Sequence, residues 1–589
     1  MEPDAVQPGR AQLEAWTVDC ALPLKGVEAG IGFDDLVPLR EWIDDARVVG
    51  LGEATHVQSE FFLLKHRMFE FLVSELDFNL FVIEAPLPQS LAINHYVLTG
   101  EGDARHSLAS MPHFIWNCEE VAGLIEWMRA WNAEHERKLF FYGCDPTVSA
   151  PAAMYLLDFL KRQYGSAYRR HRDALLPLAT DAHFSDWVLR SETEMAEART
   201  AIDEVIGTLA ELGADSPAGQ YELGLARLQA ATLSQHHEWW SVPGLEGPQR
   251  MAIRDRSMAE NTAALLALHG SNAKAAVWAH NNHIQLQSGR QLGLTEPPLG
   301  QHLRAIFGER YLSFGLCFDH GSFRIEGKDQ EMRDVTVVSA PGTLEATLGE
   351  VGPPLCALNL RGIPTAVEDE LGSAPPRVLG DSLEDKPPAA AKMSDLFDAV
   401  LFVRETTASL LRPDRSYPDE AGREYPPASA GLLNLDFAQG TDHWRRFPYP
   451  SSSGYSVAAN CGQLAISRSE SLWPSDVFAL SQTVSAEPWR GRRVSLRCQV
   501  GMVAAHEGSS AQLALRIGQR SGESDRWVPA TYYRRAAWHR VLSCDAATQE
   551  LSLTTAVDVN ADVLDIALLM IGDGRAQFGP VIVEPDPLA

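Results

Sequence analysis

Short apolar runs alternate with long amphipathic stretches over about the first 430 residues. Continuous apolar runs of this length predict strands buried on both faces of a sheet. The stretch SEFFLLKHRMFEFLVSEL (59–76) has apolar residues at helical spacing, and Ser59 is expected to cap its start. This alternation predicts an α/β fold, with a mostly parallel or mixed sheet flanked by helices. The apolar runs are RVVGL (47–51), LFVIEA (80–85), LFFYGC (139–144), AAVWAH (275–280), YLSFGL (311–316), VTVVSA (335–340) and AVLFVR (399–404).

Three regions depart from this alternation. Residues 151–265 are rich in Ala, Leu and Glu and predict a helical insertion, and residues 366–393 are rich in Pro, Gly and charge and predict an exposed loop. From LLNLDFAQGTDHW (432–444) onward, short alternating runs separated by turn signals predict an all-β sandwich or jelly roll. We therefore expect an α/β domain over 1–428 and a separable accessory domain over 429–589, which carries its own core.

The composition narrows the possible partners and cofactors. The chain has 589 residues and a formal net charge of -28, which disfavours nucleic acid and anionic membranes as partners. No run approaches the roughly 20 apolar residues of a membrane helix, and the polar start MEPDAVQPGRAQ predicts no targeting segment and a cytoplasmic location. The eight cysteines form no CxxC pair, so we expect reduced thiols and neither a zinc ribbon nor a redox pair.

The segment RVVGLGEATH (47–56) superficially resembles a dinucleotide-binding turn. The G-x-G-x-x-G fingerprint fails because Thr55 stands where the third glycine is needed, and no Walker lysine follows. Gly50 and Gly52 are instead expected to let the chain turn sharply after the strand. That turn would present Glu53 and His56.

Three further strands of the predicted sheet end in acidic or histidine residues. LFVIEA leads to Glu84, LFFYGCD to Asp145, and AAVWAHNNH to His280 and His283. Ligands of open α/β sheets bind at the carboxyl ends of the strands, so these side chains are expected at one rim. Carboxylates beside imidazoles suit general acid–base chemistry. There is no G-x-S-x-G elbow and no HExxH, so we expect neither a serine nucleophile nor a bound metal or other cofactor.

Several of these segments, in the same order, resemble the erythromycin esterase family. The resemblance covers most of residues 40–405 and implies an α/β enzyme with a helical insertion that hydrolyses the lactone of a macrolide. The matching segments are GLGEATH (50–56), EFFLLKHRMFEFL (60–72), FVIEA (81–85), WNCEEVAGLIEWMRAWN (116–132), FYGCD (141–145), RDRSMAENT (254–262) and WAHNNH (278–283).

The resemblance also implies roles for the strand-end residues. Glu53 and His56 match the family's catalytic pair, with His56 as the base that activates water, and Glu84 matches the second acidic residue. His280 and His283 match the distal histidine region, and the choice between them stays open.

Four residues are expected to bind the substrate. The family places a basic residue on the helix after the histidine, which here is Lys65 or Arg67; the basic residue and the distal histidine would stabilise the oxyanion. Trp116 and Asp145 lie in matching segments and complete the expected binding set. Val57 occupies a position that is often glycine in the family.

The sequence thus predicts hydrolysis of an ester or lactone in a bulky, macrolide-like small molecule, with glycosylated molecules included in that class. HHEWW (236–240) is expected to line the substrate cleft. Two other functions stay open: a tailoring enzyme that condenses, cyclises or eliminates with the same residues, and a non-catalytic binding protein.

The C-terminal segment has two competing roles. Its start, LDFAQGTDHW (435–444), resembles jelly rolls of the carbohydrate-binding type, and Trp527, Tyr532 and Tyr533 are either sugar-stacking residues or strand core. A structural or assembly role is favoured over sugar binding.

Overall fold

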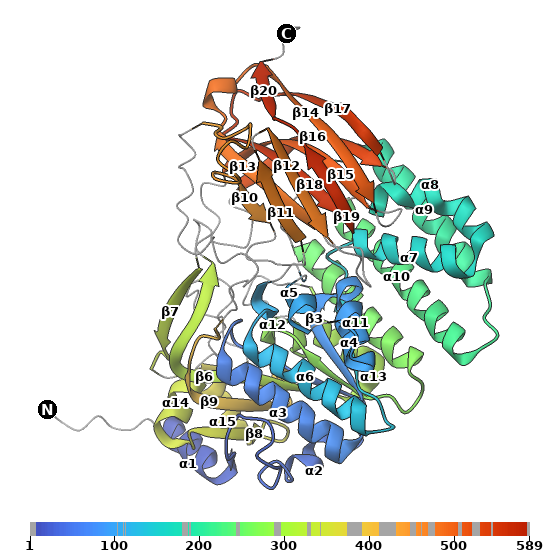
Figure 1. Ribbon diagram of the computed structural model, residues 1–589. Helices are drawn as coiled ribbons and strands as arrows, with labels where there is room; N and C mark the ends of the chain where they lie inside the picture. Colours follow the sequence, from blue (N-terminus) through green and yellow to red (C-terminus); the bar gives the residue numbers. More distant parts are fainter. Residues whose placement is uncertain are drawn as a thin grey trace, which may run out of the picture.

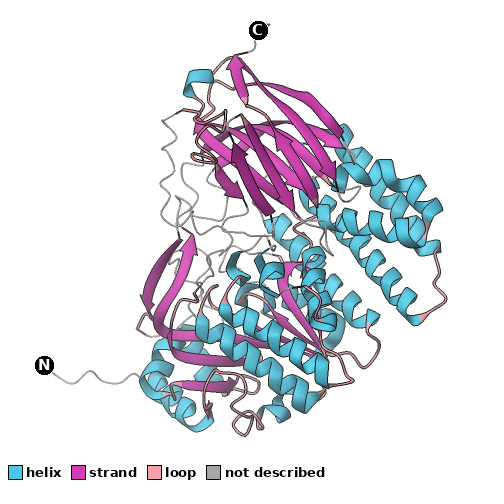
Figure 2. Cartoon of the chain, viewed as in Figure 1, coloured by secondary structure: helices cyan, strands magenta, loops and turns pink. Residues whose placement is uncertain are grey.

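The structure is a computed structural model with two parts, a mixed α/β part and an all-β part (Figures 1 and 2). It describes residues 8–102, 104–109, 111, 114–179, 187, 190–242, 248–287, 296–326, 332–341, 343–373, 392–410, 431–447, 455–460, 462–468, 477–504, 509–520, 531–542 and 546–585.

A nine-stranded mixed sheet forms the centre of the α/β part, as the sequence predicted. Its order is β1-β8-β9-β6-β2-β5-β3-β4, with β7 paired to β6. The strands from β9 to β4 in this order run parallel, whereas β1, β8 and β7 pair antiparallel. The strands are β1 (Leu22–Pro23), β2 (Val48–Leu51), β3 (Leu80–Pro86), β4 (Phe140–Asp145), β5 (Ala275–Trp278), β6 (Tyr311–Glu326), β7 (Met332–Val338), β8 (Leu355–Asn359) and β9 (Ala399–Thr406).

Helices cover both faces of this sheet because its strands are apolar on both sides. Val49 and Leu51 pack on one face with α3 and α6, whereas Val48 packs on the other with α11, α13 and α14. The helices of this part are α1 (Pro8–Cys20), α2 (Leu39–Ile43), α3 (Ser59–Leu76), α4 (Leu87–Thr99), α5 (Ala104–Ala109), α6 (Glu119–Glu134), α11 (Pro248–Leu268), α12 (Asn281–Ile284), α13 (Leu299–Phe307), α14 (Leu344–Val351), α15 (Thr365–Ser373) and α16 (Met393–Leu396), with 3-10 turns η1 (Phe114–Trp116) and η4 (Gly308–Arg310).

The predicted strands all occur, but some details differ. The run 335–340 lies on β7, whose residues alternate between half-buried and exposed because it is an antiparallel extension of β6 rather than a central strand. The pattern missed β8, which is only five residues long. Ser59 is the first residue of α3 and does not cap it; Gln58 stands at the N-cap, without a capping side-chain hydrogen bond.

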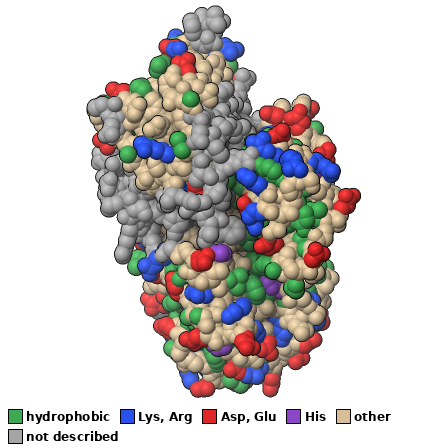
Figure 3. Space-filling view, turned by 45° about the vertical axis from the view of Figure 1, so that its right-hand side comes forward, with side chains coloured by type: hydrophobic (Ala, Val, Ile, Leu, Met, Phe, Trp, Pro, Cys, Tyr) green, Lys and Arg blue, Asp and Glu red, His purple; other side chains and the backbone are tan. Residues whose placement is uncertain are grey.

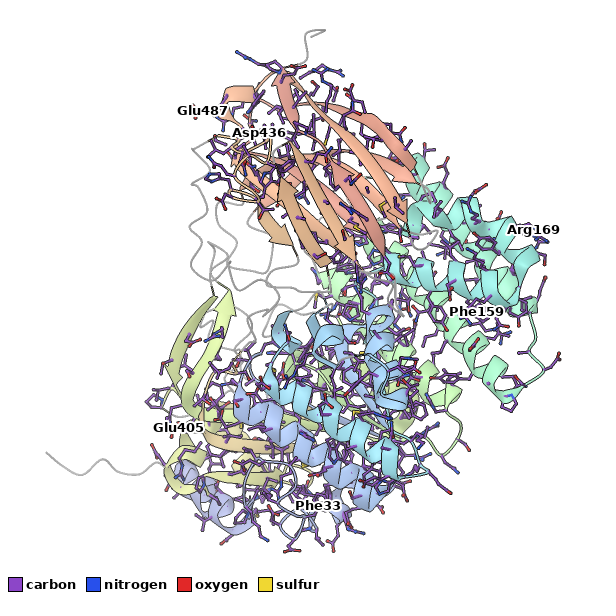
Figure 4. All side chains as sticks on the ribbon, in the orientation of Figure 1. Phe33, Phe159, Arg169, Glu405, Asp436 and Glu487 are labelled. Carbon is purple, nitrogen blue, oxygen red and sulfur yellow. The ribbon has the colours of Figure 1, made fainter. Side chains whose placement is uncertain are left out.

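The helical insertion is present between β4 and β5. Its helices are α7 (Ala150–Gln163), α8 (Gly165–Ala179), α9 (Glu192–Glu211) and α10 (Pro217–Ser241), followed by α11. In Figure 4, Phe159 lies among these helices, whereas Arg169 lies at their outer edge. The predicted loop 366–393 begins as helix α15, and residues 374–391 lie outside the described part of the chain.

The all-β part is an antiparallel sandwich of the predicted jelly-roll kind. Sheets β10-β13-β18-β15-β16 and β11-β12-β19-β14-β17, with β20 on β14, enclose one apolar core. The proposed boundary at residue 428 and Trp527 fall outside the described residues, as do the side chains of Tyr532 and Tyr533. The strands are β10 (Arg445–Phe447), β11 (Tyr455–Asn460), β12 (Gln463–Arg468), β13 (Val477–Ser485), β14 (Arg493–Ala504), β15 (Ser510–Arg520), β16 (Thr531–Leu542), β17 (Ala546–Ala556), β18 (Val563–Ile571), β19 (Gly574–Phe578) and β20 (Ile582–Pro585), with the 3-10 turn η6 (Glu487–Trp489).

The surface charges, the cysteines and the lengths of the helices can be compared with the composition. On the face drawn in Figure 3, acidic side chains are spread over the described surface, with basic ones between them. The six cysteines in the described ranges carry free thiols. Among the helices that the structure describes, none is both long enough and apolar enough to cross a membrane.

Candidate active site

The carboxyl ends of four neighbouring parallel strands meet at one rim. In spatial order these strands are β2, β5, β3 and β4. They position Glu53 and His56 after β2, His280 after β5, Glu84 within β3, and Asp145 at the end of β4. The predicted convergence of acidic and histidine residues is therefore present in the structure.

Glu53 lies at the centre of the first part of this cluster. Its fully buried carboxylate contacts His56 Nδ1 through Oε1. Its Oε2 accepts hydrogen bonds from Lys65 Nζ at 2.5 Å and from the Trp278 indole N–H at 2.8 Å. With Nδ1–H donating to Glu53, the imidazole has a fixed tautomer, so that Nε2 is the basic nitrogen. The His56 side chain is 14% exposed, whereas those of Glu53 and Lys65 are fully buried.

The charges of this pair are set by burial and by each other. Burial opposes ionisation of Glu53, but the Lys65 cation and the His56 hydrogen bond outweigh it and hold the pKa of Glu53 at about 2. Burial lowers the pKa of Lys65 to about 8, and the Glu53 carboxylate limits that fall. Near neutral pH the site therefore contains a carboxylate and an ammonium group in direct contact.

The backbone around His56 is shaped by close approach and by strain. Gly50 and Gly52 are not left-handed, as a sharp turn would require; a Cβ on Gly52 would overlap the Asn281 carboxamide, so glycine provides room there. Val57 instead has a positive φ of 60°, a conformation that costs a β-branched residue on the order of 1–3 kcal/mol. The strain lies directly beside His56 and explains why glycine suits this position.

Arg254 of α11 organises the second part of the cluster. Its guanidinium donates to Asp145 Oδ2 at 2.5 and 2.9 Å and to Glu84 Oε1 at 2.8 Å. His283 Nδ1 contacts Asp255, and its Nε2 lies 3.1 Å from Glu84 Oε1 and 3.0 Å from Arg254 Nη1. This network links the ends of β3, β4 and β5 to the insertion-side helix.

The charge pattern of this second network is also fixed. His283 and Arg254 lower the pKa of Glu84 well below its usual value despite burial. Burial disfavours protonated His283, but Asp255 and Glu84 raise its pKa to about 10. His283 is therefore a buried cation between two carboxylates, a state suited to holding charge rather than to exchanging protons.

His280 has both ring nitrogens engaged with the backbone. Its Nδ1 accepts the Asn282 N–H at 3.2 Å, and its Nε2 lies 3.1 Å from the Ala54 carbonyl oxygen. Its ring lies 5.2 Å from the His56 ring, measured between centroids. The structure thus brings both distal histidines to the site, with His280 next to His56 and His283 next to Glu84.

The structure places three of the four predicted substrate-binding residues at or beside the cluster and one of them elsewhere. Lys65 lies in the cluster, but Arg67 does not, because two positions along α3 point in different directions; its guanidinium binds Asp35 and the carbonyls of Gly26 and Gly32. Asp145 is buried, and its carboxylate accepts hydrogen bonds from Arg254. Trp116 is also buried, with its ring edge-on to His56 at a centroid distance of 6.1 Å.

Sequence reasoning missed three members of the cluster. Arg254 and Asp255 lie in RDRSMAENT, a segment that contributed to the family resemblance but ends no strand. Trp278 lies inside β5, where an aromatic residue usually indicates core packing. The adjacent charges of Arg254 and Asp255, on a helix that otherwise packs against the sheet, were the signal from which their place in the cluster could have been predicted.

The carboxylates of the cluster are occupied by protein cations and N–H donors. Within the described ranges, no group of three or more His, Cys, Asp or Glu residues is arranged to hold a metal ion. Lys65 Nζ and the Arg254 guanidinium occupy the positions beside Glu53, Glu84 and Asp145 that a divalent cation would need.

Comparison with known proteins identifies the family of the chain. The sequence model of the erythromycin esterase family matches residues 73–406. The chain belongs to this family. It is an esterase-like hydrolase in class, and the family match covers most of its α/β part, beginning after Glu53, His56 and Lys65.

Two relatives from Escherichia coli align along almost their whole length with this erythromycin esterase family member. Erythromycin esterase type II of Escherichia coli is 25% identical over 426 residues, which cover 68% of this chain and 99% of that protein. Erythromycin esterase type I of Escherichia coli is 23% identical, with coverage of 58% and 92%. A crystal structure of a succinoglycan biosynthesis protein shares the fold, with 22% identity, a TM-score of 0.62 and coverage of 69% and 100%.

The Lys65 ammonium predicts an alkaline limit of esterase activity. As the pH rises through about 8, Lys65 loses its proton and Glu53 loses the cation beside it. We expect kcat/KM to fall above this pH, and Lys65→Arg to move the alkaline limb upward by at least about one pH unit, because a guanidinium stays charged. Lys65→Met should lower kcat/KM at neutral pH by about tenfold or more, equivalent to about 1.4 kcal/mol in the barrier. An alkaline limb at the same pH in wild type and Lys65→Arg would assign it to another group.

Arg254 is expected to be essential for stability, because its removal leaves Asp145 buried without its cation and Glu84 with His283 alone. Arg254→Met should lower the free energy of unfolding by about 3–5 kcal/mol, the usual cost of breaking a buried ion pair. Arg256→Met on the same helix is the matched control: Arg256 pairs with Glu238 at the surface, and its loss should cost less than about 1 kcal/mol. Urea denaturation of both variants measures the difference, and equal losses would contradict the assigned role.

Proposed function

We propose that this enzyme hydrolyses an ester or lactone bond in a bulky natural product of the macrolide type. The observation that supports this most directly is the contact of Glu53 with both Lys65 and His56, which combines an oriented imidazole with a buried, ionised carboxylate. The names of its Escherichia coli relatives support an erythromycin-like lactone as the substrate class.

In the proposed reaction, His56 acts as the general base. Its Nε2 takes a proton from water, whose oxygen attacks the carbonyl carbon of the ester. The Glu53 carboxylate accepts Nδ1–H and stabilises the imidazolium that forms. The tetrahedral intermediate then breaks its bond to the alkoxy oxygen, which takes the proton from Nε2, so that one water yields one carboxylic acid and one alcohol.

Glu84 and His283 have a supporting part in this proposal. Their polar atoms are bound to Arg254, Asp255 and the His280 backbone N–H, so neither exchanges protons with water during the reaction. They hold the ends of β3 and β5 together, and thus hold His280 beside His56. Their charges also shape the electrostatic field in which the oxyanion develops.

The hydrolysis proposal is tested by product analysis in ¹⁸O-labelled water with erythromycin as the first substrate. We expect one labelled oxygen in the new carboxyl group, because water supplies it. His56→Gln should lower kcat/KM about 10²–10⁴-fold, the range for loss of a general base. Its side-chain amide can still donate to Glu53, so the thermal unfolding midpoint should change little.

The control for this experiment is His95→Gln, which removes a histidine from a solvent-exposed contact with Glu101 and should leave activity unchanged. A ring-opened or eliminated product without the label would indicate a tailoring reaction instead. Full activity of His56→Gln would show that another group activates water.

We also propose that the reaction needs no bound metal, because the carboxylates that a metal would use are bound to Lys65 and Arg254. Activity should survive dialysis against a chelator, and elemental analysis of the active protein should find less than stoichiometric metal. Loss of activity on chelation with recovery on adding one metal ion would overturn this proposal.

A further inference from the structure

One outer face of the C-terminal sandwich is apolar and buried. Along β18, Leu568 and Met570 point into the sandwich core, whereas Ala567, Leu569 and Ile571 point outward. The outward face of an antiparallel sheet is usually polar and in contact with water. Leu569 is nevertheless only 4% exposed, so another part of the protein covers this face.

The helical insertion provides this cover. The outward residues of β13, β15 and β18 belong to one apolar cluster with buried residues of α7, α8, α9 and α10. The same helices lie beside the strands of the sandwich in Figure 1. In Figure 4, Asp436 and Glu487 lie on the side of the sandwich away from the insertion.

The side chains of this face suit close packing of helices. Ala514 pairs with Ala567 across neighbouring strands, and Ala479 pairs with Leu569. Three alanines and few large residues give a flat surface on which helices can lie. None of the side chains that the structure describes on this face of β13, β15 and β18 is aromatic, whereas a face built to stack on sugar rings carries exposed aromatic residues.

The polar residues of the same face are satisfied within the sheet. Asp565 is buried, and its carboxylate accepts from Thr483 Oγ1 at 2.7 Å and from Arg516 Nε at 2.7 Å. The charge of Asp565 is therefore already paired. This part of the face has the composition of an internal interface and not of a polar ligand site.

The insertion connects this interface to the candidate active site. His236 of α10 is fully buried, and burial lowers its pKa to about 3, so its neutral ring donates Nδ1–H to the Pro146 carbonyl oxygen at 2.8 Å. Pro146 follows Asp145, which holds Arg254. Trp187 donates its indole N–H to Ser149 Oγ, one residue before α7. A contiguous chain of contacts thus runs from β18 through α10 to the end of β4.

We propose that the C-terminal sandwich is a scaffold for the substrate-binding side of the enzyme, not an independent glycan-binding module. It fixes the insertion by packing on α7–α10, and the insertion in turn fixes the end of β4. A glycan does not bind this face, because the protein's own helices occupy it. A chain that ends near residue 428 is accordingly expected to be insoluble, because the truncation exposes the apolar side of the insertion.

The test introduces a charge into the interface of the full-length protein. Leu569→Asp should accelerate amide hydrogen exchange in α7, α9 and α10 by about tenfold or more, because these helices lose their apolar support. Val503→Asp on β14 is the matched control: Val503 is 59% exposed, so exchange should stay as in wild type. Circular dichroism verifies that both variants keep their strands.

A milder variant covers the case in which Leu569→Asp does not fold. Ala567→Gln enlarges a side chain in the same contact and should raise exchange in the same helices. Exchange in α7–α10 that stays at the wild-type rate in a folded Leu569→Asp or Ala567→Gln protein would overturn the proposal. Affinity electrophoresis in a gel that contains soluble β-glucan tests glycan binding. If the glucan retards the wild type but not Ala567→Gln, the face binds glycan and the proposal is overturned.

The kinetic readout depends on the proposed esterase function, whereas the exchange readout does not. Leu569→Asp should raise KM for erythromycin by about tenfold, equivalent to about 1.4 kcal/mol, and leave kcat/KM for a small p-nitrophenyl ester unchanged. Accelerated exchange without any esterase activity in wild type would retain the scaffold and refute the proposed function. Unchanged exchange in a protein with normal esterase activity would refute the scaffold and retain the proposed function.

Discussion

The buried carboxylate of Glu53 is the constraint on which the rest of the site depends. An unpaired carboxylate in such a position would cost several kcal/mol, so its oxygens need donors with good geometry. The donors come from three places: the loop after β2, helix α3 and strand β5. The relative positions of these three elements are therefore fixed by one charge, and the orientation of His56 follows from them.

The second network applies the same principle on a larger scale. Three carboxylates, those of Glu84, Asp145 and Asp255, surround Arg254 and the protonated His283. Two cations and three anions, with Lys65 and Glu53 beside them, leave the buried cluster with about one net negative charge. Such a cluster is costly to bury and rigid once paired, which suits a site that must present an imidazole without reorganisation during the reaction.

The sandwich and the insertion extend this rigidity outward. The insertion leaves the sheet immediately after Asp145 and returns through the helix that carries Arg254. Its far side shares an apolar cluster with β13, β15 and β18. Residues more than 300 positions apart in the chain are thereby linked mechanically, and the C-terminal part becomes a structural component of the enzyme rather than an appendage.

The sequence by itself determined the class of the fold and most of the site. Local sequence patterns predict buried strands and amphipathic helices, because burial on both faces requires continuous apolar runs and helical packing requires a 3.6-residue period. Glu53, His56, Glu84, Asp145, His280 and His283 were predictable because each stands at or just after a strand end. Only the tertiary structure decided which other residues lie beside them. It separated Lys65 from Arg67, which differ by two positions on one helix, and it brought Arg254 and Asp255 from a helix far along the chain. Likewise, the sequence predicted short strands in the C-terminal segment but not that the helical insertion buries the outer face of β18. Pairing of charges and of apolar faces depends on distances between segments remote in sequence, and these exist only once the chain is folded.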